Sequence, residues 1–210
     1  ADVTMEVRNA DGSVAETTGN GIRCLAQAVL LAGVVDGPEL CVATGAGLRR
    51  LTVAPGEDPG EVLVQVDMGP ARLGPEHRLG PAGERTRAVD MGNPHLVILV
   101  PDLADAGVVS HGSQLDAEVP GGANVEFVTV GPGRDEITMR VWERGVGETL
   151  ACGSGACAAA AAVHDWGLVD PRVVVHQPGG DARVTLEDGS VVLTGPARHV
   201  ARIEVEVGGL

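Results

Sequence analysis

The chain has 210 residues, of which 44% are hydrophobic, and a formal net charge of -14 at pH 7. This is enough apolar material for one large domain or for two small ones that share a core. The negative charge argues against nucleic acid and anionic membrane surfaces as partners, and no apolar run approaches the roughly 20 residues of a membrane-spanning helix. All 15 basic residues are arginine. Without lysine the chain cannot form a Schiff base with pyridoxal phosphate or supply a P-loop lysine.

Short strands punctuated by Gly, Pro and Asp are predicted along most of the chain. The first strands are expected at 3–8, 39–44, 48–53 and 61–68, and later ones at 95–100, 123–130, 135–143, 172–177, 182–188, 190–195 and 199–207. Only two long helices are predicted, over 20–33 and 154–166. Each begins at a glycine-rich turn and is apolar nearly all round, which is typical of a helix enclosed by a sheet.

The two glycine-rich turns are similar in sequence. ETTGNG (16–21) aligns with LACGSG (150–155), so that Thr18 falls on Cys152 and both precede a Gly-x-Gly that opens a helix. This self-similarity predicts two halves, each a set of strands around one helix. A duplicated fold should also bring the two helix N-termini together at a cleft between the halves.

Cys152 is the first candidate for a reactive group. A helix N-terminus carries unpaired N–H groups and partial positive charge, so a thiol held there is expected to have its pKa lowered. Gly153 and Gly155 let a ligand approach the backbone closely, and their amides suit a carboxylate. Cys152 is therefore a candidate base or nucleophile. The alternative is that Cys152 is only a small buried residue.

Further polar residues stand beside turns and predicted strands. Taken singly, the asparagines are ordinary turn formers, and Glu143 with Arg144 fits a solvated pair. Taken together with the two amide-rich helix starts, they suit a zwitterionic ligand that carries a carboxylate, with Arg144 as a bidentate clamp. The candidates are Asn9, Asn93, His95, Asn124, Glu143 and Arg144.

Two other kinds of site are argued against by spacing. Gly153-x-Gly155-x-x-Ala158 matches a dinucleotide fingerprint, but no buried strand precedes it, and Asp170 comes before the next strand instead of after it. The four cysteines contain no CxxC pair, and Cys152 with Cys157 has no clustered histidine, which is poor for zinc. We expect no metal, and free thiols in a reducing cytoplasm.

Several blocks of the sequence resemble the successive signatures of the diaminopimelate epimerase family. They are RNADGSVAETTGNGIRC (8–24), VDMGNPHLVI (89–98), ANVEFV (123–128) and ERGVGETLACGSGACAAAA (143–161), and LTGPARHV (193–200) resembles the closing strand. The resemblance covers essentially the whole chain. It implies an α/β (α+β) fold of two pseudo-symmetric halves, each a curled, mostly antiparallel sheet around a central helix, with the active site in the cleft. We expect the halves at 1–84 and 85–196, with 197–210 as a closing strand that returns to the first half.

The resemblance implies an isomerase without a cofactor that interconverts LL- and meso-diaminopimelate in lysine and peptidoglycan biosynthesis. Two cysteines on opposite faces of the α-carbon would act as base and acid. Cys152 would be one of them, supported by His95 and Glu143, while the backbone at Gly19, Asn20, Gly153 and Ser154 would hold the carboxylate. Asn9, Asn93, Asn124 and Arg144 would bind the rest of the substrate. A cytoplasmic homodimer, with no nucleic-acid or membrane partner, is implied as well.

This chain departs from the family pattern in two ways. The family has a segment before the NADG block, absent from the chain, so we expect a fragment or an incomplete first half. The first catalytic cysteine falls on Thr18, and Cys24, six residues further inside the helix, does not replace it. A hydroxyl is a very poor anionic base, so three interpretations stay open. They are a weakly active epimerase, a one-thiol enzyme similar to dehydratases among the proline-racemase relatives, and an amino-acid-binding protein without activity.

Overall fold

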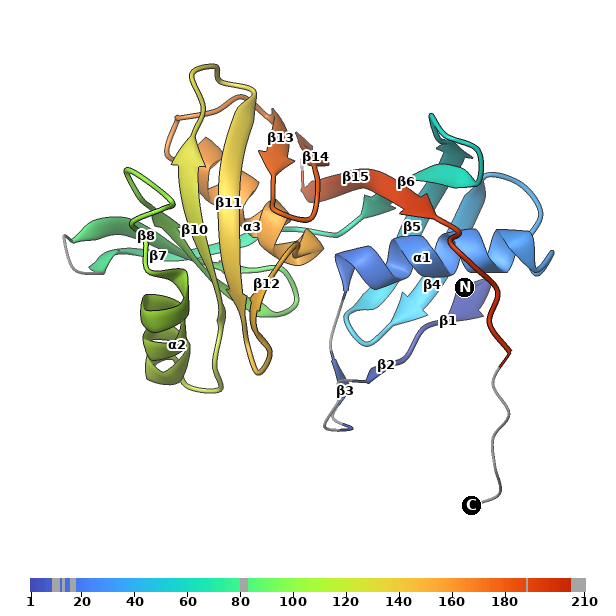
Figure 1. Ribbon diagram of the computed structural model, residues 1–210, viewed down its shortest axis with the longest axis horizontal. Helices are drawn as coiled ribbons and strands as arrows, with labels where there is room; N and C mark the ends of the chain where they lie inside the picture. Colours follow the sequence, from blue (N-terminus) through green and yellow to red (C-terminus); the bar gives the residue numbers. More distant parts are fainter. Residues whose placement is uncertain (9–11, 13, 16–17, 80–82, 188, 205–210) are drawn as a thin grey trace.

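The computed structural model describes residues 1–8, 12, 14–15, 18–79, 83–187 and 189–204. Two lobes lie side by side, each with a helix against a sheet, and one long strand runs between them (Figure 1). Neighbouring strands are antiparallel at most positions, and three pairs are parallel. The expected fold class, a mixed fold dominated by a curled antiparallel sheet, is confirmed. In the described part of the chain no helix is long and apolar enough to cross a membrane.

The first lobe contains four strands of the large sheet and one helix. Its strands are β1 (Val3–Thr4), β4 (Glu39–Thr44), β5 (Gly47–Pro55) and β6 (Glu61–Asp67), in that order across the sheet, and its helix is α1 (Gly19–Leu31). A separate two-stranded hairpin, β2 (Val7–Arg8) with β3 (Val14–Ala15), precedes the helix.

The second lobe contains the other strands and two helices. They are β7 (Arg72–Leu79), β8 (Glu84–Asp90), β9 (Pro94–Leu99), α2 (Val108–Glu118), β10 (Asn124–Val130), β11 (Glu136–Glu143), β12 (Gly147–Thr149), α3 (Gly153–Asp165), β13 (Arg172–His176) and β14 (Ala182–Glu187). The final strand, β15 (Ser190–Arg198), pairs with β14 on one side and with β6 on the other, so both lobes share one 13-stranded sheet. The boundary between the two halves, predicted after residue 84, stays a prediction. Strand β7 ends before this point, β8 begins at it, and the two strands pair with each other in the sheet.

The two long helices agree with their predicted ranges to within one or two residues, whereas several other features differ. Strands β3, β7, β8 and β12 were not expected; β7 (RLGPEHRL) and β8 (ERTRAVD) are rich in charged residues and show little apolar alternation. Helix α2 was not expected, because its sequence VVSHGSQLDAE has weak periodicity and its N-cap is Gly107 in the left-handed region at φ 60°. The strand predicted over 199–207 is absent from residues 199–204, the part of it that is described. The reason is that β15 has already reached Glu61, where its partner β6 begins; the His199 amide still donates to the Gly60 carbonyl at 3.1 Å, but the ladder with β6 ends there.

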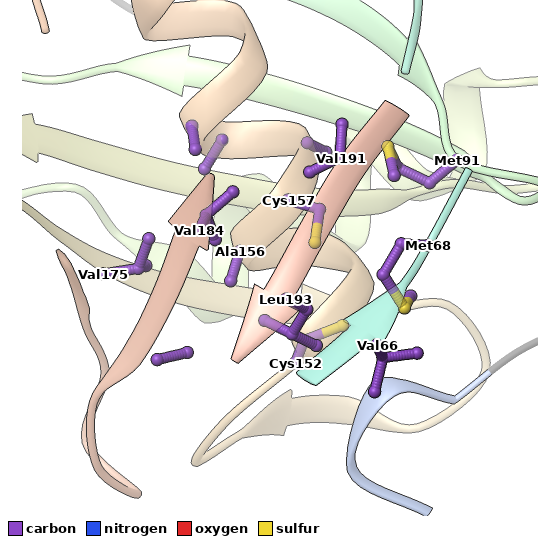
Figure 2. Close-up of a cluster of buried hydrophobic side chains, with 14 of the residues drawn as sticks. Val66, Met68, Met91, Cys152, Ala156, Cys157, Val175, Val184, Val191 and Leu193 are labelled. Atoms are coloured by element: carbon purple, nitrogen blue, oxygen red, sulfur yellow. The ribbon is translucent and has the colours of Figure 1, made fainter. Parts of the chain in front are cut away.

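The second lobe encloses its helix almost completely. Every residue of α3 from Gly153 to Val163 is buried, because strands on several sides pack against the small side chains of the alanine run. Figure 2 shows this core, in which Cys152 and Cys157 lie with Val191 and Leu193 of β15 and with Met68 and Met91. Helix α1 is covered on one face only, at Gly19, Ile22, Ala26, Gln27 and Val29. The prediction that both helices are enclosed is therefore correct for α3 and wrong for α1.

Candidate active site

Thr18 and Cys152 occupy the same position at the start of their helices. Thr18 caps α1 in an extended conformation (φ -148°, ψ 116°), and its Oγ1 accepts a hydrogen bond from the Gly21 amide at 3.1 Å. Cys152 caps α3 (φ -129°, ψ 115°), and its Sγ accepts from the Gly155 amide at 3.4 Å. The two turns therefore share one cap geometry, as the alignment of the two segments predicts.

The two helix starts touch each other through their glycines. A Cβ added to Gly19 would lie 2.8 Å from the Cα of Gly153, and a Cβ added to Gly153 would lie 2.8 Å from the Cα of Gly19. Leu193 of β15 closes the contact, with its Cδ2 within 3.0 Å of either position. Only glycine at both positions allows this approach. The contact therefore aims the N–H groups of two helices at one small region.

A cavity of about 230 Å³ lies at this junction. It is lined by most of the residues that the sequence singled out, together with three that it did not, namely Val7, Val146 and Ala151. The predicted residues on its wall are Thr18, Gly19, Asn20, Asn93, Asn124, Glu143, Arg144, Cys152, Gly153 and Ser154. His95 lies behind the wall, and Asn9 lies outside the described residues.

Asn20 connects the two lobes. Its Nδ2 donates to the carbonyl of Ala151 at 3.1 Å, and its Oδ1 accepts from Arg23 at 3.1 Å. Arg23 also donates to the Gly19 carbonyl, at 3.2 Å, so one guanidinium fixes the first turn of α1. Sequence reasoning missed Arg23, although an arginine one turn inside a helix next to a ligand-binding cap is a usable signal.

Asn124 and Arg144 form one unit in another part of the cavity wall. The Asn124 side chain accepts from the Arg144 amide at 2.9 Å, and the Arg144 guanidinium donates to the Gly121 carbonyl at 3.3 Å. Glu143, the preceding residue, accepts a short hydrogen bond from the Thr149 hydroxyl. This wall therefore offers one cationic and one anionic side chain side by side, which matches the two charges of an amino-acid head group.

Burial changes the expected acidity of Cys152. Loss of solvent, with the negative charges of Glu143 and Glu126 as smaller causes, raises the pKa of Cys152 from 9.0 to about 12. The hydrogen bonds from Ser154 and the Gly155 amide act in the opposite direction but are outweighed. The prediction of a lowered pKa for Cys152 is therefore wrong, because removing a thiolate from water costs more than one helix end returns. Cys152 is a neutral thiol, both part of the core and on the cavity wall.

Comparison with known proteins gives a consistent result. The family model for diaminopimelate epimerase matches residues 1–74 and 87–200. A diaminopimelate epimerase of Heliobacterium modesticaldum is 41% identical over 98% of this chain and 79% of that protein, and one of Desulforudis audaxviator is 44% identical over 95% and 78%.

Solved structures share the fold. A hydroxyproline epimerase from Agrobacterium vitis with bound trans-4-hydroxy-L-proline superposes with a TM-score of 0.74 at 18% identity, covering 94% of this chain and 69% of that one. A predicted epimerase from Pseudomonas aeruginosa gives 0.73 at 19% identity, with 96% and 80% covered. The fold, the paired helix starts and the sequence matches agree, and the chain belongs to the diaminopimelate epimerase family.

Proposed function

We propose that this protein is an amino-acid epimerase without pyridoxal phosphate whose substrate is diaminopimelate. The observation that carries the proposal is the contact of two equivalent helix starts, with Thr18 Oγ1 and Cys152 Sγ as matched caps from two residues that line one cavity. Inversion at a carbon needs a proton-transfer group on each face. The names of the curated relatives supply the substrate, and the paired charges of Glu143 and Arg144 suit its amino-acid head group.

The reaction removes the α-proton from one face and returns a proton to the other. The electron pair left on carbon is delocalised into the α-carboxylate, which the amides at Gly19, Asn20, Gly153 and Ser154 would hold and stabilise. A neutral Cys152 is ready to donate its proton to the carbanion on its own face. To accept a proton there instead, it must first ionise. A substrate ammonium beside Glu143 would offset one of the two negative charges that hold its pKa high.

The opposite face carries Thr18, whose hydroxyl can donate or relay a proton but makes a very poor base. Two-base epimerisation is therefore expected to be slow in both directions, because the forward and reverse reactions use the same pair of proton-transfer groups. This same asymmetry favours a second candidate, a one-thiol reaction in which Cys152 alone exchanges the α-proton. Both candidate reactions would use the same side chains to bind the substrate. These are Asn9, Asn93, Asn124 and Arg144, supported by His95 and Glu143.

Proton exchange in deuterated water separates these candidates. The protein is incubated with LL-diaminopimelate, and the α-proton signal and the LL/meso ratio are followed by NMR. Exchange with inversion is expected for the epimerase, whereas exchange without inversion supports the one-thiol reaction. If the compound binds but no exchange occurs, the enzymatic proposal is wrong and a binding protein remains. The Cys152→Ala variant is the control, and it should be silent in every case.

The cellular setting is part of the same proposal. We infer a cytoplasmic homodimer, as the family resemblance implies, and the four free cysteines fit a reducing compartment. Light scattering of the purified protein coupled to size exclusion tests the assembly, and a mass of about twice 21.3 kDa is expected.

A further inference from the structure

Three side chains form a hydrogen-bonded chain that leads from the core to the cavity wall. Glu126 of β10 contacts His95 of β9, with 2.7 Å between Oε1 and Nδ1. The other ring nitrogen of His95, Nε2, lies 3.1 Å from Oδ1 of Asn93, which lines the cavity. The side chains of Glu126 and His95 are both fully buried. The two strands are parallel neighbours, which fixes the spacing between the residues.

The carboxylate of Glu126 lies in an unusual place for a charge. Its second oxygen, Oε2, has no hydrogen-bond partner among the described residues. Its first oxygen lies against the start of α3, where a Cβ on Gly155 would approach it to 2.6 Å. The positive end of that helix helps to hold a negative charge, but a fully buried carboxylate with one unpaired oxygen still calls for a cation in contact. The only ionisable cation within hydrogen-bonding distance in the described structure is His95.

The ring of His95 has an oxygen atom at each nitrogen. When Glu126 is ionised, Oε1 is an acceptor, and Asn93 Oδ1 is always an acceptor. In the amide orientation of the structure, with Oδ1 toward the ring, both contacts are hydrogen bonds only if both ring nitrogens carry protons. That arrangement is an imidazolium held between a carboxylate and an amide oxygen. With the amide turned about, its NH₂ would donate to an unprotonated Nε2 and the ring would be neutral.

We propose that Glu126 is a positioning residue for the amino-acid site, which keeps His95 doubly protonated so that Nε2–H fixes the amide of Asn93. Because Oδ1 of Asn93 is used by the ring, the group that Asn93 has left for the cavity is its NH₂ donor. A donor there suits a carboxylate of the ligand. The inference rests on the proposed function for the ligand class, whereas the protonation of His95 does not depend on it.

Ring NMR tests the protonation directly. The histidines of the protein are labelled with ¹⁵N, and the His95 signals are assigned by their loss in the His95→Gln variant. At neutral pH, both ring nitrogens of His95 are expected to show bound protons. In Glu126→Gln, which keeps the size and removes the charge, one ring nitrogen should lose its proton. An unprotonated ring nitrogen in the unchanged protein would overturn the proposal. If Nδ1 lacks the proton, the shared proton resides on Glu126; if Nε2 lacks it, the Asn93 amide is turned about and presents its oxygen to the cavity.

Ligand binding tests the positioning. Calorimetry with meso-diaminopimelate should give a dissociation constant on the order of tenfold weaker for Glu126→Gln than for the unchanged protein, since one oriented donor is lost. The matched control is Glu136→Gln on the neighbouring strand. Its carboxylate also contacts a histidine, His176, at 3.4 Å, but both side chains are 37% exposed and far from the cavity wall. The control should leave binding unchanged.

The two measurements separate the possible failures. If the unchanged protein binds diaminopimelate and Glu126→Gln binds it equally well, the positioning role is wrong. If the unchanged protein does not bind diaminopimelate at all, the proposed function is wrong, and the ring spectrum alone decides whether Glu126 and His95 are an ion pair.

Discussion

The two helix starts are built alike but are supported very differently. Both use a capping side chain, a Gly-x-Gly turn and a close approach of backbone to backbone. Helix α3 is buried all round, whereas α1 exposes residues such as Cys24, Ala28 and Leu31. The local turn chemistry therefore does not require an enclosed helix. The difference also explains why Cys152 is a neutral thiol, since its acidity is set mainly by the surrounding core and only secondarily by its helix.

Placing a thiol at both helix caps should have the largest effect on epimerase activity. Thr18→Cys places a second thiol on the face opposite Cys152, and a general base of this kind contributes on the order of 10²- to 10⁴-fold to a rate. We expect epimerase activity toward LL-diaminopimelate to rise by at least about a hundredfold. The control is Thr18→Ser, which keeps the hydroxyl and the cap and should give no gain. A Thr18→Cys protein that folds and gains nothing would show that the two caps do not serve opposite faces of one carbon.

Forcing the starts of α1 and α3 apart should have the next largest effect, a loss of both stability and activity. Gly153→Ala adds a Cβ that would lie 2.8 Å from Gly19, so the lobes must shift apart or the backbone must bend. We expect a loss of about 1–3 kcal/mol in the free energy of unfolding, measured in urea, and at least about a hundredfold loss of activity in the Thr18→Cys background. Gly19→Ala should behave in the same way because the contact is mutual. Ala28→Ser, on the exposed face of α1, is the control and should change stability by less than about 0.5 kcal/mol.

Alkaline pH should reveal the buried thiols of α3 through a gradual loss of stability rather than a loss of activity. Burial raises the pKa of Cys152 to about 12 and also raises the pKa of Cys157. Between pH 9 and 12 the unfolded chain therefore loses thiol protons that the folded protein keeps. The unfolded state binds fewer protons, so the free energy of unfolding falls as pH rises, by about 1.4 kcal/mol per pH unit for each thiol.

Matched cysteine variants check this slope. Urea unfolding at a series of pH values should show a shallower decline for the double variant Cys152→Ala/Cys157→Ala. Cys24→Ala, which removes the exposed cysteine of α1, should keep the decline of the unchanged protein. Equal slopes in all three proteins would mean that α3 is more open to water than its burial indicates.

The sequence was informative where local chemistry decides the outcome. The glycine turns, the start of each helix and the polar residues of the cavity wall could all be predicted, because cap geometry and turn chemistry depend on a few adjacent residues. Helix α2 was missed because its sequence has only weak helical periodicity. A helix is expected at this position only once β9 and β10 are known to be parallel neighbours, since such strands need a long crossover connection. The acidity of Cys152 and the role of Glu126 depend on burial and on neighbours that are distant in sequence. A local sequence pattern contains no information about either.

Strand β15 has a consequence for the order of folding. It pairs Val192–Arg198 with β6, residues 61–67, across more than a hundred residues of intervening chain. Until it emerges from the ribosome, β6 is an unpaired edge, open to pairing with other chains. Leu193, which packs against both Gly19 and Gly153, arrives with the same strand. The first lobe and the junction of the two helix starts are therefore completed late in synthesis, and contacts of such long range are slow to form. A ribosome stalled before residue 190 should present a protease-sensitive first lobe.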